Sequence, residues 1–157
     1  MSAIEHRGAF AYYDVLETLK DALLSDVNIN TVTEGEELDR VDIANKNIYP
    51  LAHIDADDGT FTENNFQFNV SIQVIDQIDF NKIISTDKFT TNDNRQDVYN
   101  TSLQSLRRAY NELARNAVIS VSGNSTFNKV RNQKNGLIGY QLDLLIEVPN
   151  DTMSICP

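Results

Sequence analysis

The chain of 157 residues has no tryptophan, one cysteine and two histidines, and each scarcity excludes a class of protein. A single cysteine, Cys156, cannot form a disulfide within the chain, which excludes the disulfide framework of small secreted domains. The histidines, His6 and His53, lie 47 residues apart without a cysteine nearby, a spacing that does not suit zinc. No apolar run approaches the roughly 18 residues of a membrane span. We therefore expect no metal, no cofactor and no membrane anchor, and a reducing cytosol as the place of synthesis.

The sequence also lacks the motifs of common enzymes. It has six glycines and contains no Gly-x-Gly-x-x-Gly loop, no Walker loop and no Gly-x-Ser-x-Gly elbow. Residues 55–60 resemble the start of a calcium loop, but the glycine falls fifth instead of sixth. Phe66 then occupies the twelfth position, where a calcium loop needs a bidentate glutamate. The carboxylates around residues 34–42 are typical of a solvated acidic segment, so the expected function is not enzymatic.

What the chain has is enough apolar material for a core and an excess of acid. Hydrophobic residues make up 41% of the sequence, too many for a disordered chain. The length predicts one domain over residues 1–157, with flexible ends at about residues 1–7 and 150–157. The 23 acidic side chains outnumber the 13 basic ones, for a net charge of −10. Such a chain is a poor nucleic-acid binder, because that binding draws on cationic contacts with phosphate.

The charge is unevenly distributed along the chain. Residues 33–63 hold nine acids and two bases, whereas residues 82–134 hold nine bases and four acids. One interpretation is that both segments are simply solvated. The other is that they form complementary patches, which would favour association between copies of the same chain.

Two segments have the periodicity of amphipathic helices, residues 8–24 and 94–117. Asp93, followed by Gln96, resembles a capping box at the start of the second segment. The apolar stripes consist of Tyr12, Leu16, Leu19 and Leu23 in the first segment, and of Tyr99, Leu103, Leu106, Tyr110, Leu113 and Ala117 in the second.

Period-two alternation predicts the strands. A long hairpin is expected over residues 48–75, with its turn at Asp57-Asp58-Gly59 and with Leu51 and His53 on its outer face. Its returning strand, residues 66–74, alternates apolar with amide and hydroxyl side chains, so one face lies on a core. The acidic segment before the hairpin, residues 33–47, is long enough for a functional or partner-ordered loop. Further strands are expected at residues 27–31, 118–122, 125–130 and 137–148, with turns at Gly123-Asn124 and Asn135-Gly136.

This element order predicts an α+β fold with one mostly antiparallel sheet, a long β-hairpin and two amphipathic helices packed on one face. The polar face of the hairpin is rich in amides and poor in charge. It suits an ordinary solvent face or a subunit contact, where charges are depleted. The candidate subunit-interface residues are Glu34, Glu36, Glu37, Asp39, Gln67, Asn69, Ser71, Gln73, Arg107, Arg108, Arg115, Lys129 and Arg131.

The order and spacing of these segments resemble the tail terminator, or tail completion, proteins of long-tailed bacteriophages. The resemblance runs from the first helix through Ile48-Tyr49-Pro50-Leu51, the hairpin and residues 92–98 to the strand at 137–148. It implies a structural virion protein, located in the tail or neck and assembled in the host cytoplasm. It also implies a ring of six copies that contacts the tail tube protein and the neck or connector proteins.

The resemblance further implies that genome DNA passes through the ring without specific binding. An acidic lumen suits that role, because it repels the phosphate backbone. The linker at residues 79–93 and the end of the chain, residues 150–157, have no counterpart in the family pattern. Two alternatives therefore stay open: another neck or tail-tube component, or a small α+β module that binds a ligand or peptide.

Overall fold

The structure is a computed structural model, and it confirms the α+β fold class with one five-stranded sheet and two helices. It describes residues 11–36, 38, 46–79, 89, 93–116, 119–132 and 136–149. The elements are α1 (Ala11–Leu24), β1 (Thr31–Glu34), the short 3-10 helix η2 (Lys46–Ile48), β2 (Leu51–Phe61), β3 (Asn65–Gln77), α2 (Arg95–Ala114), β4 (Ser120–Asn132) and β5 (Leu137–Pro149).

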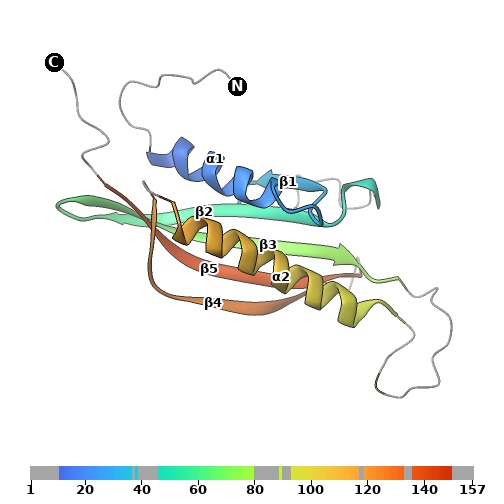
Figure 1. Cartoon of the computed structure of the whole chain (residues 1–157). Helices are drawn as coiled ribbons and strands as arrows, with labels where there is room; N and C mark the ends of the chain where they lie inside the picture. The colour runs from blue at the N-terminus through green and yellow to red at the C-terminus, as the bar shows by residue number, and fades with distance from the viewer. Residues whose placement is uncertain are drawn as a thin grey trace.

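The sheet has the strand order β1-β2-β3-β5-β4. The β2–β3, β3–β5 and β4–β5 pairs are antiparallel, and only β1 runs parallel to its neighbour β2. Both helices lie on the same face of the sheet, as the sequence predicted (Figure 1). We call this the helix-covered face and the opposite one the helix-free face. The two edges of the sheet are consequently formed by β1 with the outer part of β2, and by β4.

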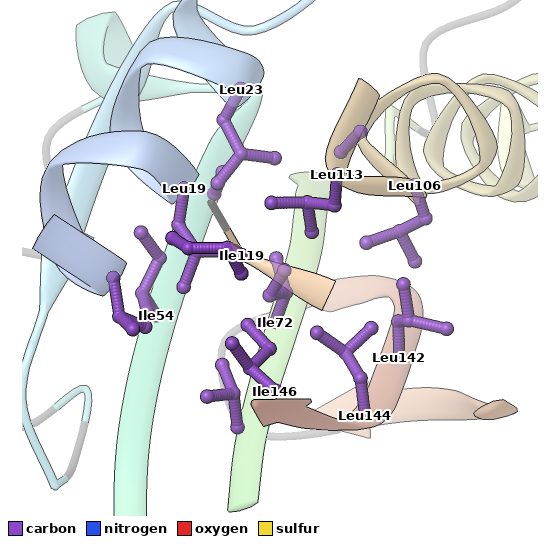
Figure 2. Close-up of a cluster of buried hydrophobic side chains, with 14 of the residues drawn as sticks. Leu19, Leu23, Ile54, Ile72, Leu106, Leu113, Ile119, Leu142, Leu144 and Ile146 are labelled. Carbon is purple, nitrogen blue, oxygen red and sulfur yellow. The ribbon is translucent and has the colours of Figure 1, made fainter. Parts of the chain in front are cut away.

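The main core fills the space between the helices and the helix-covered face. Leu19 and Leu23 of α1 and Leu106 and Leu113 of α2 point toward the sheet side chains, as Figure 2 shows. All four leucines are at most 2% exposed. Burial on this scale is the dominant favourable term in folding, at about 25 cal/mol per Å² of apolar surface. The sheet contributes to this core Ala52, Ile54, Val70, Ile72, Val74, Leu142, Leu144, Ile146 and Val148.

The second helix differs in detail from its prediction. It begins at Arg95 and ends at Ala114, and its N-cap residue Asn94 makes no side-chain cap hydrogen bond. Asp93 instead accepts a hydrogen bond from the Arg95 amide at 3.1 Å. The buried side is formed by Val98, Ser102, Ser105, Leu106, Ala109 and Leu113. The predicted stripe is therefore only half correct: Ser102 and Ser105 are buried, whereas Tyr99 and Leu103 are only half-buried. Ala117 lies outside the described residues.

The predicted hairpin turn at Asp57-Asp58-Gly59 is wrong. Strand β2 continues through these residues to Phe61, and the register with β3 shifts between Ala56 and Gly59. The irregularity is a β-bulge, which also favours short polar residues and glycine. Gly59 is required there, because a Cβ atom would collide with the carbonyl oxygen of Gln67. The hairpin is thus longer than predicted.

Two further strand predictions also needed correction. Residues 27–30 are not a strand; β1 begins at Thr31, and Val27 is 93% exposed. The two strands expected on either side of Gly123-Asn124 form the single strand β4, whose register with β5 is interrupted between Ser122 and Thr126. Glycine in the left-handed region explains the irregularity, since Gly123 has a φ of 67°.

A second, smaller apolar cluster lies at one end of the helix-free face. Leu51, Ile75 and Leu137 are buried there, and Leu38, Ile48, Tyr49 and Val130 pack against them. Leu51 and His53 were expected on the outer face of the hairpin, yet they are 0% and 3% exposed. Leu38, Ile48 and Tyr49 pack over Leu51 at this end of the face, and Thr33 and Gly35 contact the His53 ring.

Candidate functional site

The acidic candidates that the structure describes lie at one edge of the sheet. Glu34 ends β1 and Glu36 follows it, and both side chains are exposed. Glu37 and Asp39 lie outside the described residues. The neighbouring strand β2 adds Asp55, Asp57 and Asp58, and neither β2 nor β3 contains a lysine or arginine.

Negative charge is concentrated enough at this edge to affect ionisation. Burial first, and the charge of Asp57 second, raise the pKa of Asp55 above its ordinary value. Glu36 and Glu34 act in the same direction, while His53 opposes them. Among the described residues none of these acids forms an ion pair. The edge therefore presents uncompensated negative charge.

His53 anchors the segment that follows β1. Its Nδ1 lies 2.8 Å from the Thr33 hydroxyl, and its Nε2 lies 3.0 Å from the carbonyl oxygen of Gly35. Because a carbonyl oxygen only accepts, Nε2 carries a proton. The imidazole of His53 thereby holds the chain at the point where it leaves β1. With Glu36, Leu38, Asp55, Ser71, Gln73 and Gln141 it lines a hollow of about 280 Å³.

The amide candidates form a hydrogen-bonded ladder across the helix-free face. Gln67 donates to Glu147 at 2.6 Å, Ser71 donates to Asp143 at 2.6 Å, and Gln73 donates to Gln141 at 2.8 Å. Gln141 in turn donates to Asp143 at 2.8 Å.

Each rung of this ladder joins β3 to β5, so most polar groups of the face already have partners within the chain. Asn69, on the same face, is exposed and has no such partner among the described residues.

The basic candidates lie on α2 and β4. Arg107, Arg115 and Arg131 are exposed and form no ion pair within the described part of the chain. Lys129 is placed over the ring of Tyr99, 4.6 Å from its centroid, in a cation–π contact. Strand β4 contains no acid, so the edge of the sheet that it forms is basic.

Arg108 differs from the other bases, because it pairs within the chain with the buried Asp26 at 3.1 Å. Burial alone would raise the pKa of Asp26, but the Asn28 amide, Ser105 and Arg108 outweigh it, so the pKa lies below its ordinary value. The Ser105 hydroxyl does not complete a hydrogen bond of good geometry. Arg108 thus compensates a buried carboxylate between α1 and α2. No sequence pattern indicated this pair, since its members are 82 residues apart.

Taken together, the described acidic candidates lie at one edge of the sheet, and two of the five basic candidates, Lys129 and Arg131, lie at the opposite edge. The acids gather at β1 and the outer part of β2, and two of the bases lie on β4. Asp55, Asp57 and Asp58 belong to the acidic edge although we did not single them out as candidates. The signal that would have found them is the complete absence of bases from residues 51–77.

A second, smaller hollow of about 130 Å³ lies between β3, Pro50 and the first half of α2. Asp76, Asp97 and Ser102 are among its lining residues. Burial raises the pKa of Asp76, and the hydrogen bond from the Gln77 amide only partly offsets this effect. Nothing in this arrangement brings a nucleophile and a base together.

No group of three His, Cys, Asp or Glu side chains in the described part of the chain is arranged to hold a metal ion. None of the described helices is long and apolar enough to cross a membrane. In comparisons with known proteins, neither a protein-family model nor a curated protein matched this chain.

Proposed function

We propose that this chain is a structural virion protein, a subunit of a ring that caps the tail tube of a long-tailed bacteriophage and joins the tail to the head or neck. The observation that supports the proposal is the opposite charge of the two sheet edges. A surface of one sign that meets a different surface of the other sign gives a heterologous, head-to-tail contact. Such contacts produce closed rings when the rotation between subunits closes.

The resemblance to tail terminators adds the biological context. Members of that family cap the tube and let genome DNA pass through the lumen. An excess of acid suits this passage, because a negative lumen does not retain phosphate. Most polar groups that the structure describes on the helix-free face are bonded to one another, which leaves few donors and acceptors for reading a substrate.

Light scattering of the purified chain at low and at physiological salt tests the ring. We expect a mass several times that of the 17.7 kDa chain, with a lower average mass as salt screens the edges. In electron micrographs the particles should be annular. Mixing the chain with the tail tube protein of the same phage should then limit tube length. A chain that remains monomeric at all concentrations, at both salt levels and with tubes present would contradict the proposal.

The hollow beside His53 favours a second candidate, a ligand-binding module. Its acidic lining of Glu36 and Asp55 suits a small cation or an amine. Its volume of about 280 Å³ falls below the range of roughly 300–1,000 Å³ that is usual for ligand pockets. Titration of monomeric protein with small amines, followed by the NMR signals of the His53 ring, separates the two candidates. Saturable shifts without any assembly would favour the module, as would a failure to find the protein at the virion neck.

A further inference from the structure

The two edges of the sheet are open as well as oppositely charged. Strand β1 pairs with β2 only from Leu51 to Ile54. From Asp55 to Phe61 the outer side of β2 has no partner strand among the described residues. At the other edge, β4 pairs with β5 on one side alone. Each edge thus presents backbone donors and acceptors that another strand can use.

Each open edge also carries an exposed aromatic side chain. Phe61 on β2 is 81% exposed, and Phe127 on β4 is 56% exposed. Both lie on the helix-covered side, since Phe61 is opposite Phe66 and Phe127 is opposite Leu142. Exposed aromatics of this size are enriched at protein interfaces.

We propose that β4 of one copy pairs with the outer part of β2 of a second copy, so that the sheet continues from subunit to subunit. This inference deepens the proposed function and rests on it, because it names the contact that would build the ring. Main-chain hydrogen bonds between the strands supply the affinity, as in other strand additions. The charges and the two phenylalanines supply the register.

The strand directions agree with this arrangement. Successive antiparallel pairs across β2, β3, β5 and β4 make β4 run opposite to β2. When the next copy has the same orientation, its β2 is therefore antiparallel to β4, and all helices stay on one side. An antiparallel register that sets Phe61 opposite Phe127 also sets Asp57 opposite Arg131, with Asp58 the next residue along the strand.

Charge also excludes the wrong pairings. Two β4 strands would set lysine and arginine against each other, and two β2 strands would set aspartates against each other. Like charges directly opposite in a sheet are destabilising. Bases and bulges on an edge strand often serve only to prevent aggregation. Here the opposite edge is acidic, so the same bases select the heterologous pairing and reject the symmetric one.

Two full-length charge-reversal variants test the contact by light scattering and sedimentation. The first carries Lys129→Glu and Arg131→Glu, and the second carries Asp57→Lys and Asp58→Lys. Each alone sets like charges against each other and should weaken self-association about fivefold, the effect of the one directly opposed pair, Asp57 and Arg131. In an equimolar mixture the two variants can alternate, so that an acidic edge of one meets a basic edge of the other at every contact. The mixture should therefore regain the mass of the wild-type assembly.

The matched control carries Arg107→Glu and Arg115→Glu, the same change in charge placed on α2. It should assemble like wild type. The edge pairing is overturned if either edge variant alone assembles as the wild-type chain does. It is also overturned if the mixture does not assemble although both variants keep the wild-type circular dichroism. In either case the proposal of a ring can still hold with another contact. If the wild-type chain itself never assembles, both proposals fall.

Discussion

The two faces of the sheet are built by opposite means. On the helix-covered face every inward position from Val70 to Val74 of β3 is apolar, and these side chains are at most 2% exposed. On the helix-free face the alternate residues Ser71 and Gln73 form hydrogen bonds with side chains of β5. One face is held by contact area and the other by paired polar groups, along the same strands.

The two faces therefore contribute differently to the free energy of folding. Apolar burial on one face is sufficient to fix the strands and both helices, at about 1.5–3 kcal/mol for each large side chain. The net contribution of a hydrogen bond is smaller, about 0.5–1.5 kcal/mol, because water competes for the same groups. Changes on the helix-covered face should therefore affect folding, whereas changes among the polar groups in the middle of the helix-free face and at the edges should be tolerated. The following substitutions test this contrast, from the largest expected effect to the smallest.

Ile146 and Leu145 are adjacent on β5 and lie on opposite faces. Ile146 is 0% exposed in the main core, so Ile146→Ala should lower the free energy of unfolding by about 2–5 kcal/mol. Leu145→Ala removes a half-buried side chain from the helix-free face and should cost about 1 kcal/mol. Urea denaturation measures both values. Equal losses would contradict the contrast between the faces.

His53 is a buried polar residue on the helix-free face, 3% exposed and bonded to Thr33 and Gly35. His53→Ala leaves the Gly35 carbonyl without its ring partner and should cost about 1–3 kcal/mol. Thr33→Val serves as the control, since it keeps the bond to Gly35 and should cost less. Denaturation gives the energies, and hydrogen exchange near residues 35–38 should increase only in His53→Ala. A loss no larger than that of Thr33→Val would show that the Gly35 bond does not secure this segment.

The sequence predicted what depends on local periodicity and missed what depends on distant contacts. The spacing of Leu19 and Leu23 identified the buried side of α1, and alternation identified the two faces of β3 and β5. The burial of His53 was missed because it depends on Thr33 and Gly35, which meet its ring from the end of a parallel strand that precedes it by about 20 residues. The bulge at Gly59 was mistaken for a turn because both favour glycine and aspartate. The edge charges were visible in the sequence, but only the strand order assigns them to opposite edges.

Gln141 tests the polar ladder itself. It accepts a hydrogen bond from Gln73 and donates one to Asp143. Gln141→Leu keeps a similar volume and removes both bonds, but water can reach the half-buried partners, so the loss should be about 1 kcal/mol. Asn69→Ala, on the same face and without a described partner, should change stability by less than about 0.5 kcal/mol. Thermal denaturation monitored by circular dichroism suffices for the comparison. A larger loss at Asn69 than at Gln141 would show that the ladder does not stabilise the sheet.

Asp76 lies on the helix-covered face at the end of a row of apolar side chains. Unlike the substitutions of those apolar side chains, removal of its charge should raise the free energy of unfolding. Burial raises its pKa, so the folded chain binds this proton more tightly than the unfolded chain, whose pKa is about 3.9. The free energy of unfolding should therefore decrease as the pH rises from the unfolded to the folded pKa, and should then stay level. Asp76→Asn removes this decrease, while its side-chain oxygen still accepts the Gln77 amide. The free energy of unfolding of the variant, relative to that of the wild-type chain, should increase slightly as the pH rises from 4 to 7. Paired urea denaturations at each pH measure this difference. An advantage that is largest at pH 4 would mean that Asp76 is stabilised, rather than strained, by its surroundings.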